Sequence, residues 1–314
     1  MRSPRTLICG SLARDTIMVF PDRFARHILP EQTHMLSVSF QIGQMRQEWG
    51  GCSGNIAYNL KAIGGEPVVM ATVGEDGGAF AERFTALGIA HEGMRTVPDT
   101  FSAQAFIITD LDDNQITAFH PGAMNQSHLN HVSDVEGIEL GIVAPDGKEG
   151  MMSHVRGFAA AGIPFVFDPG QGLPLFSGSE LLEMVDAADY VAVNDYEGRL
   201  LTERTGLPMS DIASRVEALV VTQGGDGSRI YCRGEIIDVP AVPASAVVDP
   251  TGCGDAYRAG LLYGIANKWD WLRTGRLASL LGSLKIASRG AQNHNVQRDQ
   301  IAQMYAQHFG GALW

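Results

Sequence analysis

Strand-like and helix-like segments alternate through the second half of the chain, and this order constrains the fold more than any other feature. Short apolar runs rich in β-branched and aromatic residues lie at 140–144, 165–167, 190–193 and 219–222. Helical patterns follow the first three runs at about 150–161, 180–188 and 197–205. Because parallel strands are joined by crossover segments that are usually helices, this alternation predicts a doubly wound α/β sheet that is mainly parallel.

The other segments fit a single domain over residues 1–314 that carries a small β-sheet lid. Two apolar runs, 103–109 and 115–119, flank the turn-like sequence DLDDN and predict a β-hairpin. We expect the lid to come from inserted segments at about 16–49 and 101–122. Further strands are expected at 6–12, 17–20, 35–40 and 67–73, and further helices at 54–63, 78–87, 255–266, 272–288 and 297–308.

The composition argues against several classes of function. The formal net charge is −12 and no run of Lys or Arg occurs, which argues against binding to nucleic acid or to an anionic membrane. No apolar run approaches the length of a membrane span, and the apolar start is too short for a signal peptide. The four cysteines lack the spacing of a zinc site. We therefore expect a cytoplasmic protein with reduced thiols, in which backbone amides or a metal hold any phosphorylated ligand.

A glycine-rich turn, DPTGCGDAY at residues 249–257, precedes the helix expected at 255–266. Such a turn presents consecutive backbone N–H groups at a helix N-terminus, where the helix dipole also favours negative charge. On spacing alone, Asp255 has two interpretations of equal weight. It is either an N-terminal cap of the helix or a carboxylate that accepts a proton from an attacking hydroxyl.

The same segment resembles the C-terminal signature of the ribokinase (PfkB) family of kinases, whose usual form is close to D-T-x-G-A-G-D-x-F. The resemblance implies a ribokinase-like three-layer α/β/α sandwich with a small β-sheet lid, and ATP as co-substrate. It further implies that Gly252, Cys253 and Gly254 form an anion hole over the transferred phosphoryl group and that Asp255 is the catalytic base. Pro250 has no N–H group, so it cannot contribute a donor.

A second glycine cluster, GGCSGNIAYNL, begins at residue 50 and opens the helix expected at 54–63. It is similar to the N-terminal signature of the family, G-G-x-x-x-N-x-A. The similarity implies that Gly50, Gly51 and Asn55 contact a sugar. Asp15 follows the first strand and matches the family's aspartate, whose carboxylate accepts hydrogen bonds from two vicinal hydroxyls. A carboxylate that binds a diol in this bidentate manner requires a substrate such as a ribose.

Two further motifs resemble the nucleotide-binding side of the family. The sequence NDYE follows the strand expected at 190–193 and resembles the family motif Asn-x-x-Glu. The resemblance implies that Asn194 orients phosphates and that Glu197 holds Mg²⁺ through water. The loop TQGGDG follows the strand at 219–222 and matches T-x-G-x-x-G, which implies that Thr222, Gly224 and Gly227 contact the nucleotide.

The loop at residues 290–294 corresponds to the family segment that borders the adenine. The resemblance implies that Asn293 and His294 are neighbours of the base. It also allows a monovalent cation, K⁺, beside Asp249. The other histidines are too dispersed for a metal site.

Within the family, the N-terminal sequence and the long lid segment are most like those of the bacterial nucleoside and adenosine kinases. Phe106 and Phe119 lie on the predicted hairpin and could sandwich a purine, although lid aromatics could equally form the lid's own core or a dimer interface. We therefore expect a purine nucleoside 5′-kinase, with adenosine as the first candidate and inosine or guanosine as further ones. The main alternative is a kinase for ribose or a ketohexose, and the chain is expected to be a monomer or a homodimer.

Overall fold

Nine strands within the described residues form one main sheet, in the spatial order β13-β12-β11-β10-β9-β8-β1-β4-β5. The computed structural model describes residues 3–28, 37–112, 114–295 and 297–314. Neighbouring strands are parallel except for the pairs β11–β12 and β12–β13 at one edge. The strands are β1 (Arg5–Cys9), β4 (Glu66–Val73), β5 (Ala90–Thr96), β8 (Leu140–Val143), β9 (Phe165–Phe167), β10 (Tyr190–Asn194), β11 (Ala218–Thr222), β12 (Ser228–Cys232) and β13 (Glu235–Val239).

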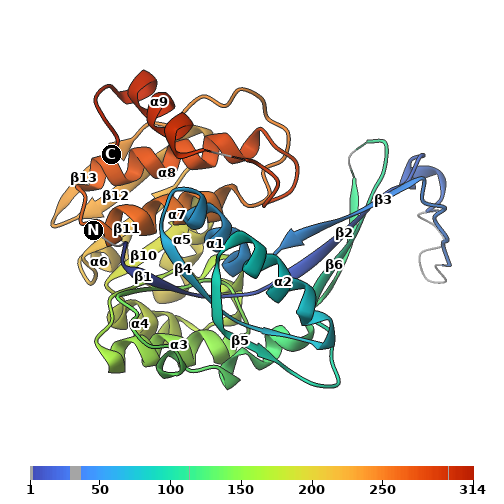
Figure 1. Ribbon diagram of the computed structural model, residues 1–314, viewed down its shortest axis with the longest axis horizontal. Coiled ribbons are helices and arrows are strands. Elements are labelled where there is room, and N and C mark those ends of the chain that lie inside the picture. The colour runs from blue at the N-terminus through green and yellow to red at the C-terminus, as the bar shows by residue number, and fades with distance from the viewer. Residues whose placement is uncertain (1–2, 29–36, 113, 296) are drawn as a thin grey trace.

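Helices cover both faces of this sheet and so complete the three layers predicted from the sequence (Figure 1). One face carries α1 (Cys52–Ala62), α2 (Gly78–Leu87), α7 (Cys253–Ala266), α8 (Trp271–Ile286) and α9 (Arg298–Phe309). The other carries α3 (Lys148–Ala161), α4 (Gly178–Ala187), α5 (Asp195–Thr205) and α6 (Met209–Ala213). In the described part of the chain, no helix is long and apolar enough to cross a membrane.

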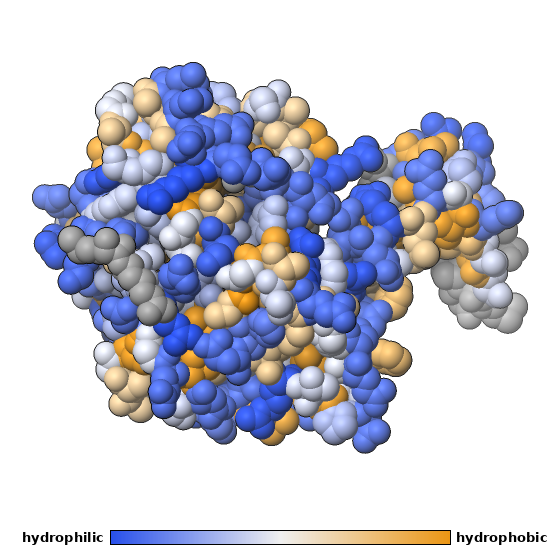
Figure 2. Space-filling model, viewed as in Figure 1, coloured by the Kyte–Doolittle hydropathy of each residue, from blue (hydrophilic) through white to orange (hydrophobic). Residues whose placement is uncertain are grey.

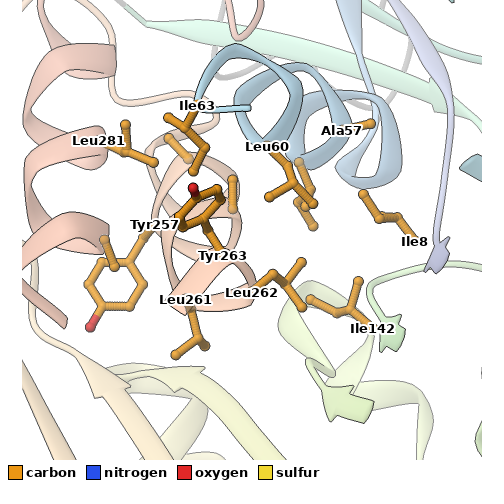
Figure 3. Packing of buried hydrophobic residues seen from close by; sticks show 14 of the residues in the cluster. Ile8, Ala57, Leu60, Ile63, Ile142, Tyr257, Leu261, Leu262, Tyr263 and Leu281 are labelled. Atoms are coloured by element: carbon orange, nitrogen blue, oxygen red, sulfur yellow. The ribbon is translucent and has the colours of Figure 1, made fainter. Parts of the chain in front are cut away.

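Strand alternation sends neighbouring side chains into two separate cores. Leu7 and Cys9 of β1 pack toward the α3–α6 face, whereas Ile8 between them packs toward α1 and α7. Figure 3 shows the second of these cores, in which Ile8 and Leu60 approach Leu262 of α7. The long helix α7 is therefore anchored by its apolar residues, and its N-terminus is held at a fixed place above the sheet.

Successive strands are added to one side of β1 first and to its other side afterwards. The chain proceeds from β1 through β4 to β5 on one side, and then returns to place β8 on the other side of β1. Ligands of doubly wound sheets bind in the crevice at the carboxyl ends of the strands, at such a switch point. The loops after β1, β8, β9 and β10 all open at this edge.

A separate four-stranded sheet, in the order β3-β2-β6-β7, forms a lid that projects from the body (Figure 1). Its strands are β2 (Ala13–Val19), β3 (Gln44–Gly50), β6 (Ala103–Thr109) and β7 (Gln115–His120). The predicted hairpin is thus observed as β6–β7. Figure 2 shows that this projection carries apolar as well as polar surface.

Part of the aromatic content of the lid forms its own small core. The rings of Phe20, Phe24 and Phe40 lie within 4.9–5.9 Å of one another, and Phe20 and Phe24 are buried. For these three residues the structure therefore favours the second of the two roles considered from the sequence, the packing of the lid itself.

Several strands differ from the sequence predictions. The strand expected at 35–40 is wrong, because 37–40 have no strand structure, while 35 and 36 fall outside the described residues along with the rest of 29–36. The lid strand at Gln44–Gly50 was missed because its sequence QMRQEWG is mostly polar and only its last residue is buried. Strand β12 and the edge strands β5 and β13 were also missed. Edge and lid strands lack the continuous apolar run that marks a buried parallel strand.

Candidate active site

The glycine-rich turn leads directly into the N-terminus of α7. Gly252 precedes the helix with a φ angle of 79°, which L side chains rarely adopt, and a Cβ there would lie 2.7 Å from that of Ala291. Gly254, in the first turn, has open space where a Cβ would stand. The first N–H groups of a helix have no intrahelical acceptor. The Cys253 amide, however, donates to the Pro250 carbonyl at 3.1 Å, so Gly252 and Gly254 are the better placed amides for an anion.

Asp255 lies in the first turn of α7 but does not cap it. The N-cap residue is Gly252, and no side-chain cap bond is present at this helix. The Asp255 carboxylate instead accepts a hydrogen bond of 2.8 Å from Asn55 Nδ2 of α1. Asn55 Oδ1 in turn accepts from Gln292 Nε2 at 3.0 Å. The carboxylate is therefore held by a side chain from another element, and the interpretation as a helix cap is wrong.

Burial raises the pKa of Asp255 to about 6. The hydrogen bond from Asn55 acts in the opposite direction and lowers the pKa, while the charge of Asp168 raises it. A carboxylate with a pKa near 6 is ionised at neutral pH and is a stronger base than an ordinary aspartate. These are the properties required of a general base that works near pH 7.

A buried ion pair lies beside Asp255 and was not found from the sequence. Arg258 Nε and Nη2 donate to the two oxygens of Asp168 at 3.0 and 3.2 Å, and both side chains are buried. Asp168 directly follows β9 at the carboxyl edge of the sheet, and Arg258 stands one helical turn after Asp255. An arginine within the apolar helix AYRAGLLYGIA was the signal that could have revealed the pair.

Asn194 and Glu197 form a reciprocal capping box at the start of α5. Asn194 Oδ1 accepts from the Glu197 amide, and Glu197 Oε2 accepts from the Asn194 amide, both at 2.7 Å. Burial raises the pKa of Glu197, as does the charge of Asp168. The described residues contain no cluster of three or more Asp, Glu, His or Cys arranged for a metal. One carboxylate that acts through water fits Mg²⁺, which keeps much of its hydration shell.

A cavity of about 470 Å³ lies beside the N-terminus of α7. It brings three of the predicted nucleotide contacts, Thr222, Gly224 and Gly227, together with Cys253 and Gly254. Thr222 is also the registered neighbour of Asn194 across β10 and β11. The walls that the sequence did not reveal are mostly apolar or small: Gly225, Ala241, Val242, Pro243, Ala244, Val247, Pro250, Tyr257, Ser279, Gly282, Ser283 and Ile286. A mostly apolar cavity bordered by exposed amides suits a flat base joined to phosphates.

On the lid side, Asp15 approaches the second glycine cluster, which begins at Gly50. A Cβ on Gly50 would lie 2.7 Å from Asp15 Oδ2, and a Cβ on Gly51, whose φ is 88°, would collide with the Ser11 carbonyl oxygen. Burial, followed by the charges of Glu48 and Asp249, raises the pKa of Asp15 to about 6. The carboxylate is thus placed where a ligand could approach the backbone of the cluster.

Phe106 and Phe119 lie on opposite faces of the lid. Asp15 is registered with Ala105, which is registered with Phe119, so these residues share one face. Phe106 is registered with Thr16, the next residue along β2, and therefore points to the other face. The expectation that both rings sandwich one purine is wrong, because the side chains of a strand alternate. Phe119 lies on the face of Asp15, and its contact with a purine stays a prediction.

Asn293 and His294 lie among residues of the lid and of α1. Asn293 Nδ2 donates to Glu48 Oε2 at 2.6 Å. His294 Nε2 is 2.7 Å from Asn59 Oδ1, and the Tyr58 hydroxyl donates to the His294 carbonyl at 2.6 Å. Within the described chain neither residue lines the cavity beside α7. The structure therefore does not bring them together with the predicted nucleotide contacts.

Asp249 makes no cation site of the expected kind. Its carboxylate accepts from the amides of Thr251 and Gly290 at 2.9 and 2.8 Å, and these bonds lower its pKa despite burial. Its carbonyl oxygen accepts a hydrogen bond of 2.7 Å from the Lys285 ammonium. The residues here do not fit K⁺, because an ammonium group already bonds the carbonyl that would hold the ion.

Comparisons with known proteins agree with this fold. A family model described as pfkB family carbohydrate kinase matches residues 17–298. A curated nucleoside kinase from Methanocaldococcus jannaschii is 29% identical over 276 residues, which cover 87% of this chain and 90% of that protein.

Solved structures of a nucleoside kinase from Burkholderia thailandensis are similar over nearly the whole chain. The complex with inosine is 51% identical, covers 98% of this chain and 99% of that one, and has a TM-score of 0.88. The complex with ADP and inosine is 52% identical, covers 98% and 97%, and has a TM-score of 0.86.

Proposed function

The chain belongs to the pfkB family of carbohydrate kinases, and from this premise we propose that it transfers the γ-phosphoryl group of ATP to the 5′-hydroxyl of a purine nucleoside. Relatives at 51% and 29% identity are nucleoside kinases, and ATP-dependent phosphorylation of a nucleoside is the activity of this chain. The observation that carries the finer proposal is the Asp255 carboxylate, held by Asn55 at the N-terminus of α7 beside a mostly apolar cavity.

Asp255 is the proposed general base. Its carboxylate accepts the proton of the 5′-hydroxyl as the oxygen attacks the γ-phosphorus, and the bond between that phosphorus and the β,γ-bridging oxygen breaks. The products are the nucleoside 5′-phosphate and ADP. Because burial raises the pKa of Asp255 to about 6, the carboxylate is ionised at neutral pH and yet basic enough to take part in the transfer.

The N-terminus of α7 stabilises the negative charge of the transferred group. The amides of Gly252 and Gly254 lie at the start of the helix, where the helix dipole adds a positive potential. Arg258 is neutralised locally by Asp168, so we assign this pair to the support of the first turn rather than to direct contact with phosphate. Mg²⁺, when bound through water to Glu197, would neutralise charge on the phosphate oxygens.

Asp15 is the proposed anchor for the ribose. A carboxylate beside Gly50 can accept hydrogen bonds from two vicinal hydroxyls, which leaves the 5′-hydroxyl directed toward Asp255. Asn55 already forms hydrogen bonds with Asp255 and Gln292, so its main role is to hold the proposed base. Any remaining amide hydrogen can donate to the sugar. The inosine bound by the 51% identical relative supports a purine nucleoside as the substrate.

A substrate panel tests the proposal. Adenosine, inosine, guanosine, ribose and fructose should be assayed with Mg-ATP by release of ADP. At least one purine nucleoside should be turned over with a kcat/KM at least about tenfold above that of either free sugar, the scale of one well-placed contact. Turnover of the sugars without turnover of any nucleoside would refute the assignment.

The role of Asp255 has a separate test. Asp255→Asn should lower kcat by at least about a hundredfold, as expected for loss of a general base, with little change in nucleoside KM. A loss of less than about fivefold, measured on a variant with an unchanged melting temperature, would exclude Asp255 as the base.

A further inference from the structure

Lys285 of α8 is a buried ammonium group outside the catalytic set described above. Its side chain is fully buried, and its Nζ donates to the carbonyl oxygens of Asp249 and Ser288 at 2.7 and 3.0 Å. A charged group removed from water carries a large desolvation cost. The ammonium therefore needs its hydrogen bonds to both carbonyls, because they replace the hydrogen bonds that water would make.

The carbonyl bonded by Lys285 belongs to the residue that begins the glycine-rich turn. Asp249 is tied to the end of α8 through all of its polar groups. Its amide donates to the Ile286 carbonyl at 3.1 Å, its carbonyl accepts from Lys285, and its carboxylate accepts from the Gly290 amide. The same carboxylate accepts from the Thr251 amide, which lies within the turn. The position of the turn thus depends on these hydrogen bonds to the end of α8, and the Lys285 ammonium donates one of them.

The positive charge of Lys285 also reaches the start of α7. Its charge favours the ionised forms of both Cys253 and Asp249, although burial keeps the pKa of Cys253 raised overall. The described residues that face the ammonium most closely are carbonyl groups rather than a carboxylate salt bridge. An ammonium that is not paired with a carboxylate leaves a positive potential close to the turn that must hold a phosphoryl group.

We propose that Lys285 is an internal cation that positions the turn at residues 250–254 for anion binding, and that phosphoryl transfer by this protein needs no added monovalent cation. A buried ammonium bonded to two carbonyls has the charge and the oxygen partners of a bound K⁺ ion, but it is attached to the chain. Lys285 is a positioning residue, since it acts through Asp249. This inference rests on the proposed kinase activity.

The first experiment uses the unaltered protein and needs no variant. Inosine phosphorylation by Mg-ATP is measured in K⁺, NH₄⁺ and tetramethylammonium salts at equal ionic strength, with the Tris salt of ATP. The expected turnover differs by less than about twofold among the three cations, within the scatter that a general salt effect gives. Activation by K⁺ of more than about tenfold over tetramethylammonium would overturn the inference. If no nucleoside is turned over in any salt, the proposed function fails instead, which keeps the two failures distinct.

The second experiment removes the ammonium. Lys285→Met keeps most of the side-chain volume and should lower kcat by about tenfold or more, the effect of losing one electrostatic contributor, while nucleoside KM changes little. Lys61→Met is the matched control, since Lys61 is a partly exposed lysine of α1 whose nearest acid, Glu66, lies 3.8 Å away. The control should retain full turnover. Equal kcat values for the two variants would overturn the inference.

The third experiment asks whether a free cation can replace the side chain. Lys285→Ala leaves space beside the Asp249 and Ser288 carbonyls, so K⁺ or NH₄⁺ should restore at least about tenfold in kcat, whereas tetramethylammonium is too large to enter. Melting temperature provides a readout that does not depend on catalysis. K⁺ should raise it by about 2 °C or more in Lys285→Ala and leave the unaltered protein unchanged. A folded Lys285→Ala that responds to none of these cations in either assay would refute the inference.

Discussion

Replacing Asn55 with leucine should raise the pKa of Asp255, the proposed base, and move the acid limb of the pH–rate profile. Asn55 Nδ2 donates to Asp255 at 2.8 Å, and this bond lowers the pKa of Asp255 against the effect of burial. Leucine matches asparagine closely in shape, so the variant removes the donor with little change in volume. The protonated form of Asp255 then becomes relatively more stable than it is in the unaltered protein.

The magnitude follows from the strength of the lost bond. A hydrogen bond to a charged group contributes about 1.5–3 kcal/mol, and about 1.4 kcal/mol corresponds to one unit of pKa. The pKa of Asp255 should therefore rise from about 6 to between about 7 and about 8. A protonated base cannot accept the hydroxyl proton, so activity is lost as the pH falls through this value. At pH 7 the ionised fraction drops from about 0.9 to between about 0.5 and about 0.1.

The assay is kcat/KM for inosine between pH 5 and pH 9.5, with Mg-ATP saturating. Asn55→Leu should be about twofold to tenfold less active than the unaltered protein at pH 7, with a smaller deficit at pH 9. Gln292→Leu keeps the bond between Asn55 and Asp255 and should shift the limb less. An acid limb that does not move would refute the reasoning, because Asp15, with a pKa also near 6, would then control it. A deficit that is equal at every pH would point to lost binding instead.

Three further predictions concern the start of α7. Removing one partner of the buried pair, as in Arg258→Met or Asp168→Asn, should cost about 3–5 kcal/mol of unfolding free energy in urea, and the double variant should cost less than the sum of the two; strict additivity would contradict the contact. Gly252→Ala should lower stability by about 1–3 kcal/mol because of its φ angle, whereas Gly254→Ala should leave the melting temperature unchanged, and equal losses would count against the geometry. Burial raises the pKa of Cys253 to about 11, so iodoacetamide should modify this thiol slowly at pH 7 and faster only as the pH approaches that value; rapid loss of the Cys253 thiol by mass spectrometry at pH 7 would disprove it.

The sequence by itself determined the class of fold and pointed to the turn proposed as the centre of the chemistry. Alternating strands and helices specified a parallel sheet with helices on both faces, since each apolar run is short, local and continuous. The turn before α7 was recognisable because its function depends on consecutive residues: a glycine at positive φ, small neighbours and Asp255 in the first helical turn. Local features of this kind are visible in a single stretch of sequence.

Only the tertiary structure decided which side chains meet across long separations in the chain. Asn55 and Asp255 are 200 residues apart, Asp168 and Arg258 are 90 apart, and Lys285 reaches Asp249 across 36 residues. No local pattern encodes such contacts, because they depend on the order in which the strands lie in the sheet and on the face from which each helix packs.

The faces of the lid strands were also decided only by the tertiary structure. Its strands could be assigned only in part, and a shift of one residue in register exchanges the two faces of a strand. Phe106 and Phe119 were equivalent in the sequence, yet the pairing of β2 with β6 and of β6 with β7 places Phe119 alone on the face of Asp15. The sequence therefore identified Asp255, the proposed base, whereas register and strand order decided which groups hold its carboxylate, because both are properties of the assembled sheets rather than of any one segment.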